Sequence, residues 1–356
     1  MALPRFGAQL PRAQSPYTSM RTRLALLIAC VAAAAAMLAA SCGDDGDQRL
    51  TIYSGRSPEL VGPLLERFAE ETGIDVGVRY GSTAQLAALL IEEGDQSPAD
   101  IFISQDAGAL GAVQAAGLFT DIDDDILERV ASTYRSREGQ WVGLSGRARV
   151  VVYNTEVLDP ADLPDSILEF TDPKWRGRVA WAPTNGSFQA WVTALRVSEG
   201  EDGARAWLEG MRANEAPEFP NNSSIVEAVG RGEVDAGLVN HYYLSRFLAE
   251  QGDDFPARNY HTGPGDIGTL VNVAGAGVLR TSKATDSARQ FLEFMLSEEA
   301  QRYYAETNTE YPLVAGVEGA PGLRSIADLQ PPAIDLSDLW DLEGTLRLLR
   351  SAGVLP

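Results

Sequence analysis

The chain has 356 residues and is strongly acidic, with 50 Asp and Glu residues against 29 Lys and Arg residues and a formal net charge of −21 at pH 7. This charge argues against nucleic acid and anionic membrane surfaces as partners. The two cysteines, Cys30 and Cys42, both lie near the N-terminus. The rest of the chain therefore has no thiol for a disulfide, a nucleophile or a sulfur-ligated metal.

The N-terminus carries the pattern of a secretory signal sequence. Two arginines closely follow Met20, and an apolar run extends over residues 24–40. We expect residues 1–41 to be a signal peptide. A start at Met20 would give the signal ordinary proportions, which makes residues 1–19 an upstream extension or a misplaced start.

The segment "LAASCG" (38–43) resembles a bacterial lipobox, in which a lipoprotein is cut before a cysteine that is then acylated. A small residue precedes Cys42, and the polar stretch "GDDGDQ" follows it. This predicts an acylated cysteine and tether over residues 42–48, and a protein anchored by lipid to the extracytoplasmic side of the cell membrane. The alternative is an ordinary cleaved signal with an incidental cysteine. No second long apolar run follows, so we expect membrane contact only through the lipid.

The body begins with alternating strand and helix patterns. The helix after the first strand starts at Pro58 with Ser57 as its cap, and it ends at Gly73. The next helix starts with the capping box "STAQ" (82–85) and ends near Gly94. Strands are predicted over residues 50–53, 74–80 and 99–104.

This alternation predicts an open α/β sheet with ligands outside the carboxyl ends of its strands. The turns at these strand ends, where ligand contacts are expected, are residues 54–57, 81–83 and 104–106. Further along, β-rich stretches are predicted at 143–154, 177–182 and 268–280, and helices at 188–197, 203–213 and 287–306. These later elements favour a second α/β lobe.

The stretch "VDAGLVNHYYLSRFLAE" (234–250) places two adjacent tyrosines where a buried strand turns into a helix. Asn240 is a candidate cap for that helix. Tyr242 and Tyr243 would then lie in the first helical turn, where the helix dipole and free N–H groups favour a phenolate. The alternative is one core aromatic beside one rim aromatic.

Taken together, several segments resemble the periplasmic ferric-iron-binding proteins, the solute receptors of iron ABC importers. The resemblance covers residues 50–315. The matching segments are "TIYSGRSPEL", "EEGDQSPADIFIS", "LSGRARVVVYN", "DPKWRGRVAW", "NSSIVEAVGRGEVDAGLVNHYYL", "AGAGVLRTS" and "EYPL".

This resemblance implies a two-lobed type II periplasmic binding protein, each lobe a mixed open sheet flanked by helices, with the ligand in the interlobe cleft. By analogy, residues 49–149 and 273–323 form lobe 1, and residues 150–272 and 324–356 form lobe 2.

The same resemblance implies that Tyr242 and Tyr243 are phenolate ligands of Fe(III), a hard cation that prefers anionic oxygen donors. The positions where the family often carries histidine and glutamate ligands hold Ser57 and Gln105 here. Arg56, Ser57 and Gln105 are therefore only possible contacts of the metal or its anion.

The family's anion contacts come from an "SG" turn and two asparagines. Ser145, Gly146 and the backbone of Arg147 match the turn, and Asn222 and Asn240 match the asparagines. Backbone N–H groups in a tight turn form an oxyanion nest, to which Arg147 can add a bidentate contact. The expected synergistic anion is carbonate, phosphate or citrate.

These expectations describe a lipid-anchored, monomeric receptor that binds ferric iron with an anion and delivers it to an ABC importer permease, without catalysis. One alternative keeps the fold but binds an oxyanion, an organic acid or an iron–citrate complex. An alternative of another class is an exported α/β hydrolase, for which only His241 and His261 are available as imidazole bases.

Overall fold

Residues 49–356 are the part of the chain that the computed structural model describes. The predictions for the signal peptide, for Cys42 and for the tether lie outside these residues. Within the described part, none of the helices combines the length and the hydrophobicity that a membrane span requires.

The first part of the described chain forms the strands and helices that the sequence predicts. Pro58 is the first residue of its helix, and Gly73 ends that helix at φ 71°. Ser57 occupies the cap position, but its side chain makes no capping hydrogen bond, so that detail of the prediction is wrong. The elements are β1 (Arg49–Ser54), α2 (Pro58–Thr72), β2 (Asp75–Tyr80), α3 (Thr83–Glu93), β3 (Ile101–Ser104), α4 (Ala107–Ala115) and α5 (Asp124–Leu127).

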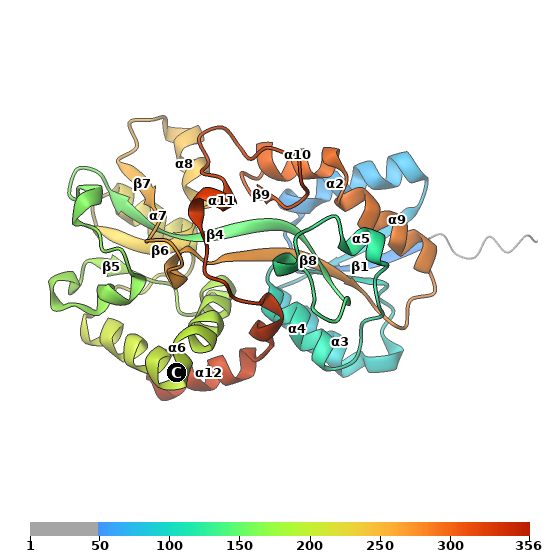
Figure 1. Cartoon of the computed structure of the whole chain (residues 1–356), viewed down its shortest axis with the longest axis horizontal. Coiled ribbons are helices and arrows are strands. Elements are labelled where there is room, and N and C mark those ends of the chain that lie inside the picture. Colours follow the sequence, from blue (N-terminus) through green and yellow to red (C-terminus); the bar gives the residue numbers. More distant parts are fainter. Residues whose placement is uncertain (1–48) are drawn as a thin grey trace, which may run out of the picture. The chain divides into compact units, whose positions relative to one another are not determined.

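The central strand is β4 (Val142–Asn154), whose residues are all buried. The first half of β4 runs antiparallel to β8 (Val271–Val278), with Arg147 opposite Asn272. Figure 1 shows these two strands passing side by side through the middle of the fold. The strand order is β2-β1-β3-β8-β4-β6-β5, where β6 is Ala236–Asn240 and β5 is Val179–Ala180. Two further strands, β7 (Ala257–Tyr260) and β9 (Tyr311–Pro312), also pair with β4. The strand β4 therefore joins the part of the sheet formed by β2, β1, β3 and β8 to the part formed by β6 and β5.

The second half of β4 pairs with the elements that carry the tyrosine pair. Arg149 lies opposite Asn240, the last residue of β6. The long helix α6 is interrupted at Gly200, where φ is 74°, so the prediction of two successive helices is confirmed. The elements are β5 (Val179–Ala180), α6 (Gly186–Ala213), α7 (Asn222–Gly230), β6 (Ala236–Asn240), α8 (Tyr242–Gln251) and β7 (Ala257–Tyr260).

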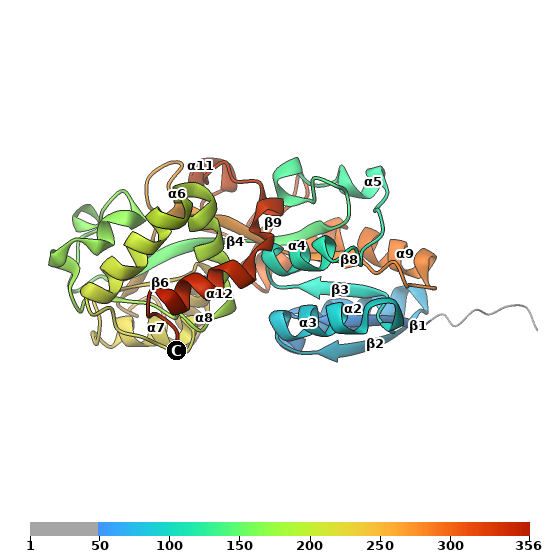
Figure 2. The ribbon, with the colours of Figure 1, turned by 90° about the horizontal axis from the view of Figure 1, so that it is seen from below.

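The C-terminal part contains one clear departure from the prediction. The single helix expected over 287–306 is two helices, because Ser297 leaves the helical conformation and its side chain accepts a hydrogen bond from the backbone N–H of Ala300. Viewed from below, α12 lies along α6 (Figure 2). The elements are α9 (Thr285–Met295), α10 (Glu298–Glu306), β9 (Tyr311–Pro312), α11 (Ile326–Leu329) and α12 (Leu342–Ser351).

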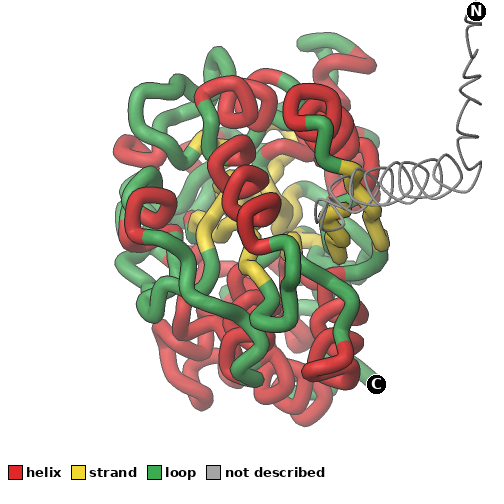
Figure 3. Tube along the Cα trace, turned by 90° about the vertical axis from the view of Figure 1, so that its right-hand side faces the viewer, coloured by secondary structure: helices red, strands yellow, loops and turns green. Residues whose placement is uncertain are grey.

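Helices and loops enclose the strands, as Figure 3 shows. Val150 and Val152 of β4 belong to a smaller apolar cluster with α7, whereas the intervening Val151 belongs to the main apolar core. This alternation is expected, because successive residues of a strand point to opposite faces of the sheet. The predicted α/β class, a mixed sheet flanked by helices, is confirmed. The lobe boundaries remain a prediction.

Candidate metal and anion site

The three turns at the predicted strand ends, residues 54–57, 81–83 and 104–106, lie in contact with one another. The Gly81 N–H donates to the Ser54 carbonyl at 3.2 Å. The Thr83 hydroxyl donates to the Gly55 carbonyl at 3.4 Å and accepts from the Gln105 N–H at 3.1 Å. A Cβ on Gly55 would lie 2.1 Å from the Thr83 Oγ1, so this close approach requires glycine. The strand ends thus form one connected surface, as the α/β rule predicts.

The tyrosine pair occupies the first two positions of α8, as the sequence predicts. The two rings are stacked, with centroids 4.4 Å apart and an interplanar angle of 27°. Tyr242 is only 1% exposed, and its hydroxyl has no hydrogen-bond partner in the described structure. Tyr243 is half-buried. Arg246, one turn further along, lies 5.8 Å from each ring centroid.

Burial raises the pKa of Tyr242 well above that of a free phenol, and the neighbouring Tyr243 raises it further. Arg147 and Arg56 oppose this effect only in part. The Tyr242 phenol is therefore neutral near pH 7 in the protein without a ligand. A buried polar group without a partner costs free energy, and either a bound cation or a water molecule would satisfy it.

Asn240 does not cap α8, so that prediction is wrong. The cap position belongs to His241, which makes no side-chain capping bond. The Asn240 side-chain oxygen instead accepts a hydrogen bond from Arg149 at 3.1 Å. The Asn240 N–H donates to the Asn222 side-chain oxygen at 3.0 Å, so the two predicted anion residues lie in contact. Asn222 also donates to the Asn185 oxygen at 3.3 Å.

The predicted turn at Ser145, Gly146 and Arg147 is also wrong. These residues lie inside β4, which pairs with β8 on one side, while Ser145 and Gly146 also pair with β9 on the other. Their backbone groups therefore belong to strand ladders and do not form a turn nest. The role of these residues in holding an anion remains a prediction, and in this geometry it would depend on the Arg147 side chain.

Two buried arginines on one face of β4 border a small cavity. Arg147 is 2% exposed and Arg149 is 5% exposed. Arg147 donates to the Gln105 carbonyl through Nη2, but its Nε and Nη1 have no partner in the described structure. The lining residues are Arg147, Arg149, Ser187, Trp191, Asn240, Leu270 and Asn272. The prediction missed Arg149, although its spacing of two from Arg147 places both on the same strand face.

Burial lowers the pKa of both arginines, but both keep their positive charge. It lowers the pKa of Arg149 to about 10 and also lowers the pKa of Arg147. A guanidinium keeps its proton in proteins, so both arginines carry their charge at neutral pH. Asp106, whose pKa is raised by its own burial, is the acidic neighbour of Arg147, and it caps α4 by accepting from the Ala109 N–H at 2.9 Å.

A buried ion pair completes the cluster. Arg56 Nη2 lies 2.8 Å and 2.9 Å from the two carboxylate oxygens of Glu310. The Ser145 hydroxyl donates to the same carboxylate at 2.6 Å. Burial is the largest single influence and would lower the pKa of Arg56, but the charge and hydrogen bond of Glu310, together with Tyr242 and Tyr304, outweigh it and the pKa is raised. Ser57 is exposed, so of this turn it is Arg56 that enters the site. The prediction did not identify Glu310.

Comparisons with known proteins agree with this geometry. A family model described as a bacterial extracellular solute-binding protein matches residues 96–327. The major ferric iron-binding protein of Neisseria meningitidis serogroup B is 36% identical over 346 residues, which span 93% of this chain and 98% of that protein. The chain belongs to the periplasmic ferric-iron-binding protein family.

Solved structures of the ferric-iron-binding family support the same assignment. Iron-bound HitA from Pseudomonas aeruginosa matches with a TM-score of 0.81 and 36% identity, covering 86% of this chain and 99% of that one. The Trichodesmium protein IdiA, or FutA, in complex with iron and citrate matches with a TM-score of 0.76 and 30% identity, with the same coverage. The predicted type II periplasmic binding fold and the predicted family are confirmed.

His241 of this ferric-iron-binding family member is not arranged as a ligand or as a catalytic base. Both ring nitrogens of His241 are occupied: Nδ1 accepts from the Ala148 N–H at 3.2 Å, and Nε2 donates to the Thr309 carbonyl at 2.7 Å. Burial lowers the pKa of His241 to about 4, and it also lowers the pKa of His261 to about 4. The contacts of His241 are those of a structural residue, which argues against the hydrolase alternative.

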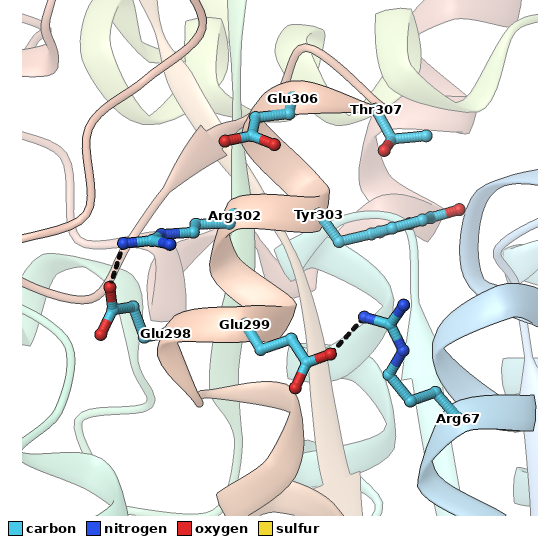
Figure 4. A pocket seen from close by; sticks show the side chains of 7 residues that line it. All are labelled: Arg67, Glu298, Glu299, Arg302, Tyr303, Glu306 and Thr307. Carbon is cyan, nitrogen blue, oxygen red and sulfur yellow. Dashed lines mark hydrogen bonds and ion pairs between the residues drawn. The ribbon is translucent and has the colours of Figure 1, made fainter. Parts of the chain in front are cut away.

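An open groove on α2 and α10 is separate from the predicted site. Figure 4 shows that its charges are largely paired among themselves, Arg67 with Glu299 and Arg302 with Glu298. Its lining residues are Arg67, Glu298, Glu299, Arg302, Tyr303, Glu306 and Thr307. None of the predicted ligand or anion residues is among them, so this groove is not the site of the tyrosine pair.

Proposed function

We propose that the chain is a receptor that binds ferric iron through the phenolate oxygens of Tyr242 and Tyr243, together with a synergistic anion. The observation that carries this proposal is the stacked tyrosine pair at the start of α8, with the buried Tyr242 hydroxyl lacking any partner in the described structure. Membership of the ferric-iron-binding family supports it.

The chemistry of the pair suits this cargo. Fe(III) prefers anionic oxygen donors, and such a cation deprotonates the groups that bind it. A phenol ordinarily titrates near 10, so binding the metal as phenolates would release one proton from each tyrosine at neutral pH. The N-terminus of α8 and the arginines facing Tyr242 would stabilise the phenolate that forms. Iron affinity should therefore rise with pH and fall in acid.

The charge of the site supports an anion of at least two negative charges. Arg56, Arg147 and Arg149 contribute three positive charges, and Glu310 and Asp106 contribute two negative charges when both are ionised, so 3 − 2 leaves +1. Fe(III) adds three and the loss of two phenol protons subtracts two, which gives +2 before an anion binds. Carbonate, phosphate and citrate can all supply this compensation, and Arg147, Arg149 and Asn240 are the residues that would hold them.

The unpartnered Nε and Nη1 of Arg147 favour a second candidate function, a receptor for an oxyanion or organic acid without iron. In that case the tyrosines would form only a wall of the site. Such a receptor would bind its anion equally well with and without iron, and no colour would develop. An iron–citrate complex as the cargo would need both components at once.

The proposed cellular role is delivery of iron to an ABC importer permease by a monomeric protein anchored through Cys42. Ligand contacts to lobe 1 (49–149 and 273–323) and to lobe 2 (150–272 and 324–356) would stabilise a closed state, which is a population shift. Cys42→Ala should release the protein from the membrane fraction or leave its signal uncut. A mature protein that lacks lipid and starts at another residue would contradict the anchor.

The proposed function is tested by titrating the purified protein with Fe(III) in the presence and absence of carbonate, phosphate or citrate. The expected result is a visible tyrosinate-to-iron charge-transfer band that saturates at one iron per chain and needs the anion. Anion binding measured by calorimetry on the same iron-free sample separates the two candidate functions. Anion binding with no coloured iron complex would favour the metal-free receptor.

A further inference from the structure

The segment "EYPL" (310–313) is part of the family resemblance, but the proposed function gives it no role beyond the charge of Glu310. Its first residue, Glu310, is 0% exposed and accepts hydrogen bonds from Arg56 and Ser145. Arg56 lies 254 positions earlier in the sequence. A charge so deeply buried is costly unless it is paired, so this arrangement indicates a specific need for a carboxylate at this place.

The backbone that carries Glu310 is fixed from two sides. Asn308 donates to the Leu60 carbonyl of α2 at 3.0 Å. The Thr309 carbonyl accepts from His241, the residue directly before Tyr242, at 2.7 Å. Thr309 has a φ of 56°, a conformation that costs a non-glycine residue about 1 kcal/mol or more. The chain tolerates this strain and thereby places the carboxylate between the turn after β1 and the start of α8.

We propose that Glu310 is a positioning residue of the iron site, which holds Arg56 beside Tyr242 and cancels its positive charge. The inference rests on the proposed function, because it concerns how much positive charge the iron and its anion meet. Arg56 and Glu310 both lie close enough to Tyr242 and to Arg147 for their charges to act on them. With Arg56 neutralised, Arg147 and Arg149 determine the demand for an anion.

Electrostatics determines whether loss of the Glu310 charge raises or lowers the affinities for iron and for the anion. Without the Glu310 charge, Arg56 would add one uncompensated positive charge beside an iron ion that already carries three. Like charges at such short range in a buried site repel by more than 1 kcal/mol. Fe(III) affinity should then fall, while affinity for a free polyanion should rise. A residue that only fills space would change neither.

The test uses Glu310→Gln, which keeps the shape and removes the charge. Glu299→Gln is the matched control, because Glu299 lies on α10, is half exposed and loses the same charge. The double variant Arg56→Gln/Glu310→Gln removes both members of the pair and restores the net charge. Each protein is titrated with Fe(III) at several citrate concentrations, and citrate binding to the iron-free protein is measured by calorimetry.

We expect Glu310→Gln to weaken iron binding at low citrate by about tenfold or more and to tighten citrate binding to the iron-free protein, with the charge-transfer band unmoved at saturation. Glu299→Gln should behave as wild type, and the double variant should restore the citrate dependence. If Glu310→Gln does not fold, the double variant compared with Arg56→Gln alone gives the same information, because Arg56→Gln leaves Glu310 uncompensated and should shift citrate binding the opposite way.

Unchanged iron and citrate binding in a folded Glu310→Gln protein would overturn the proposal. So would a shifted band at saturation in both Glu310→Gln and the double variant, because it would make Glu310 an iron ligand. A wild-type protein without coloured iron binding would instead contradict the proposed function. The citrate measurement on iron-free protein tests Glu310 even in that case.

Discussion

The two polar regions of the site differ in how their buried groups are satisfied. At the start of α8, the Tyr242 hydroxyl is buried and has no partner in the described structure. A short distance away, the Glu310 carboxylate is just as deeply buried but accepts hydrogen bonds from Arg56 and Ser145. Under the proposed function, the first group binds the ligand, whereas the second organises the charge that the ligand meets.

The largest expected difference between the two groups is in the free energy of unfolding, measured without iron after each group is removed. Glu310→Ala leaves a buried, unpaired Arg56 and should reduce the free energy of unfolding by about 3 to 5 kcal/mol. Tyr242→Phe removes an unsatisfied hydroxyl and should leave it unchanged or raise it by about 1 kcal/mol. Urea denaturation followed by circular dichroism measures both. Equal losses in the two variants would contradict the distinction.

The pH dependence of stability sharpens the same comparison, because the half-buried His261 also has a buried atom without a partner, Nδ1. Burial, assisted by the charge of Arg324, lowers its folded pKa to about 4, below the unfolded value near 6.5. The contribution of His261 to the free energy of unfolding is therefore complete above pH 6.5 and is lost as the pH falls towards 4. Between pH 7 and 4, His261→Gln should lose about 2 kcal/mol less unfolding free energy than wild type. Identical pH profiles would show that His261 titrates alike in both states.

A smaller effect is expected at Arg149, one of the two arginines that border the small cavity beside β4. Arg149→Gln should raise the anion concentration needed for half-maximal iron retention by about tenfold, which is about 1.4 kcal/mol. Arg246→Gln is the control, because Arg246 is exposed and lies over the tyrosine rings rather than in the arginine cavity. Iron retention assayed against a competing chelator at graded citrate or phosphate gives the comparison. Equal responses of the two variants would exclude a special role for Arg149.

Local signals made most of the fold and the tyrosine pair predictable from the sequence. Pro58 and Gly73 mark the ends of α2, and a strand followed by amphipathic spacing places Tyr242 at a helix start. Each of these signals lies within a few residues of the feature it specifies. The break at Ser297 was missed although the sequence carries a signal for it, a serine followed by two glutamates in the next helical turn.

The rest of the site depends on contacts that no local pattern contains. Glu310 directly precedes the two-residue strand β9, and its partner Arg56 is 254 residues away in sequence. The family resemblance implied a turn at Gly146, but its pairing with β8 and β9 keeps it in the β-rich stretch that the local pattern predicts. Asn240 has the residue type of a helix cap, yet Arg149 from the neighbouring strand takes its side-chain oxygen. At Asn240, a tertiary partner therefore outweighed the local preference.

The central claim, that the two phenols bind ferric iron, is tested most directly by a Fe(III) titration of the Tyr242→Phe/Tyr243→Phe double variant beside wild type at saturating citrate. The rings remain, so the packing of α8 is retained while both oxygens are lost. The account predicts that the charge-transfer band disappears and that iron binding is abolished, while the free energy of unfolding changes by no more than about 1 kcal/mol. A double variant that binds iron with wild-type affinity and colour would contradict the assignment.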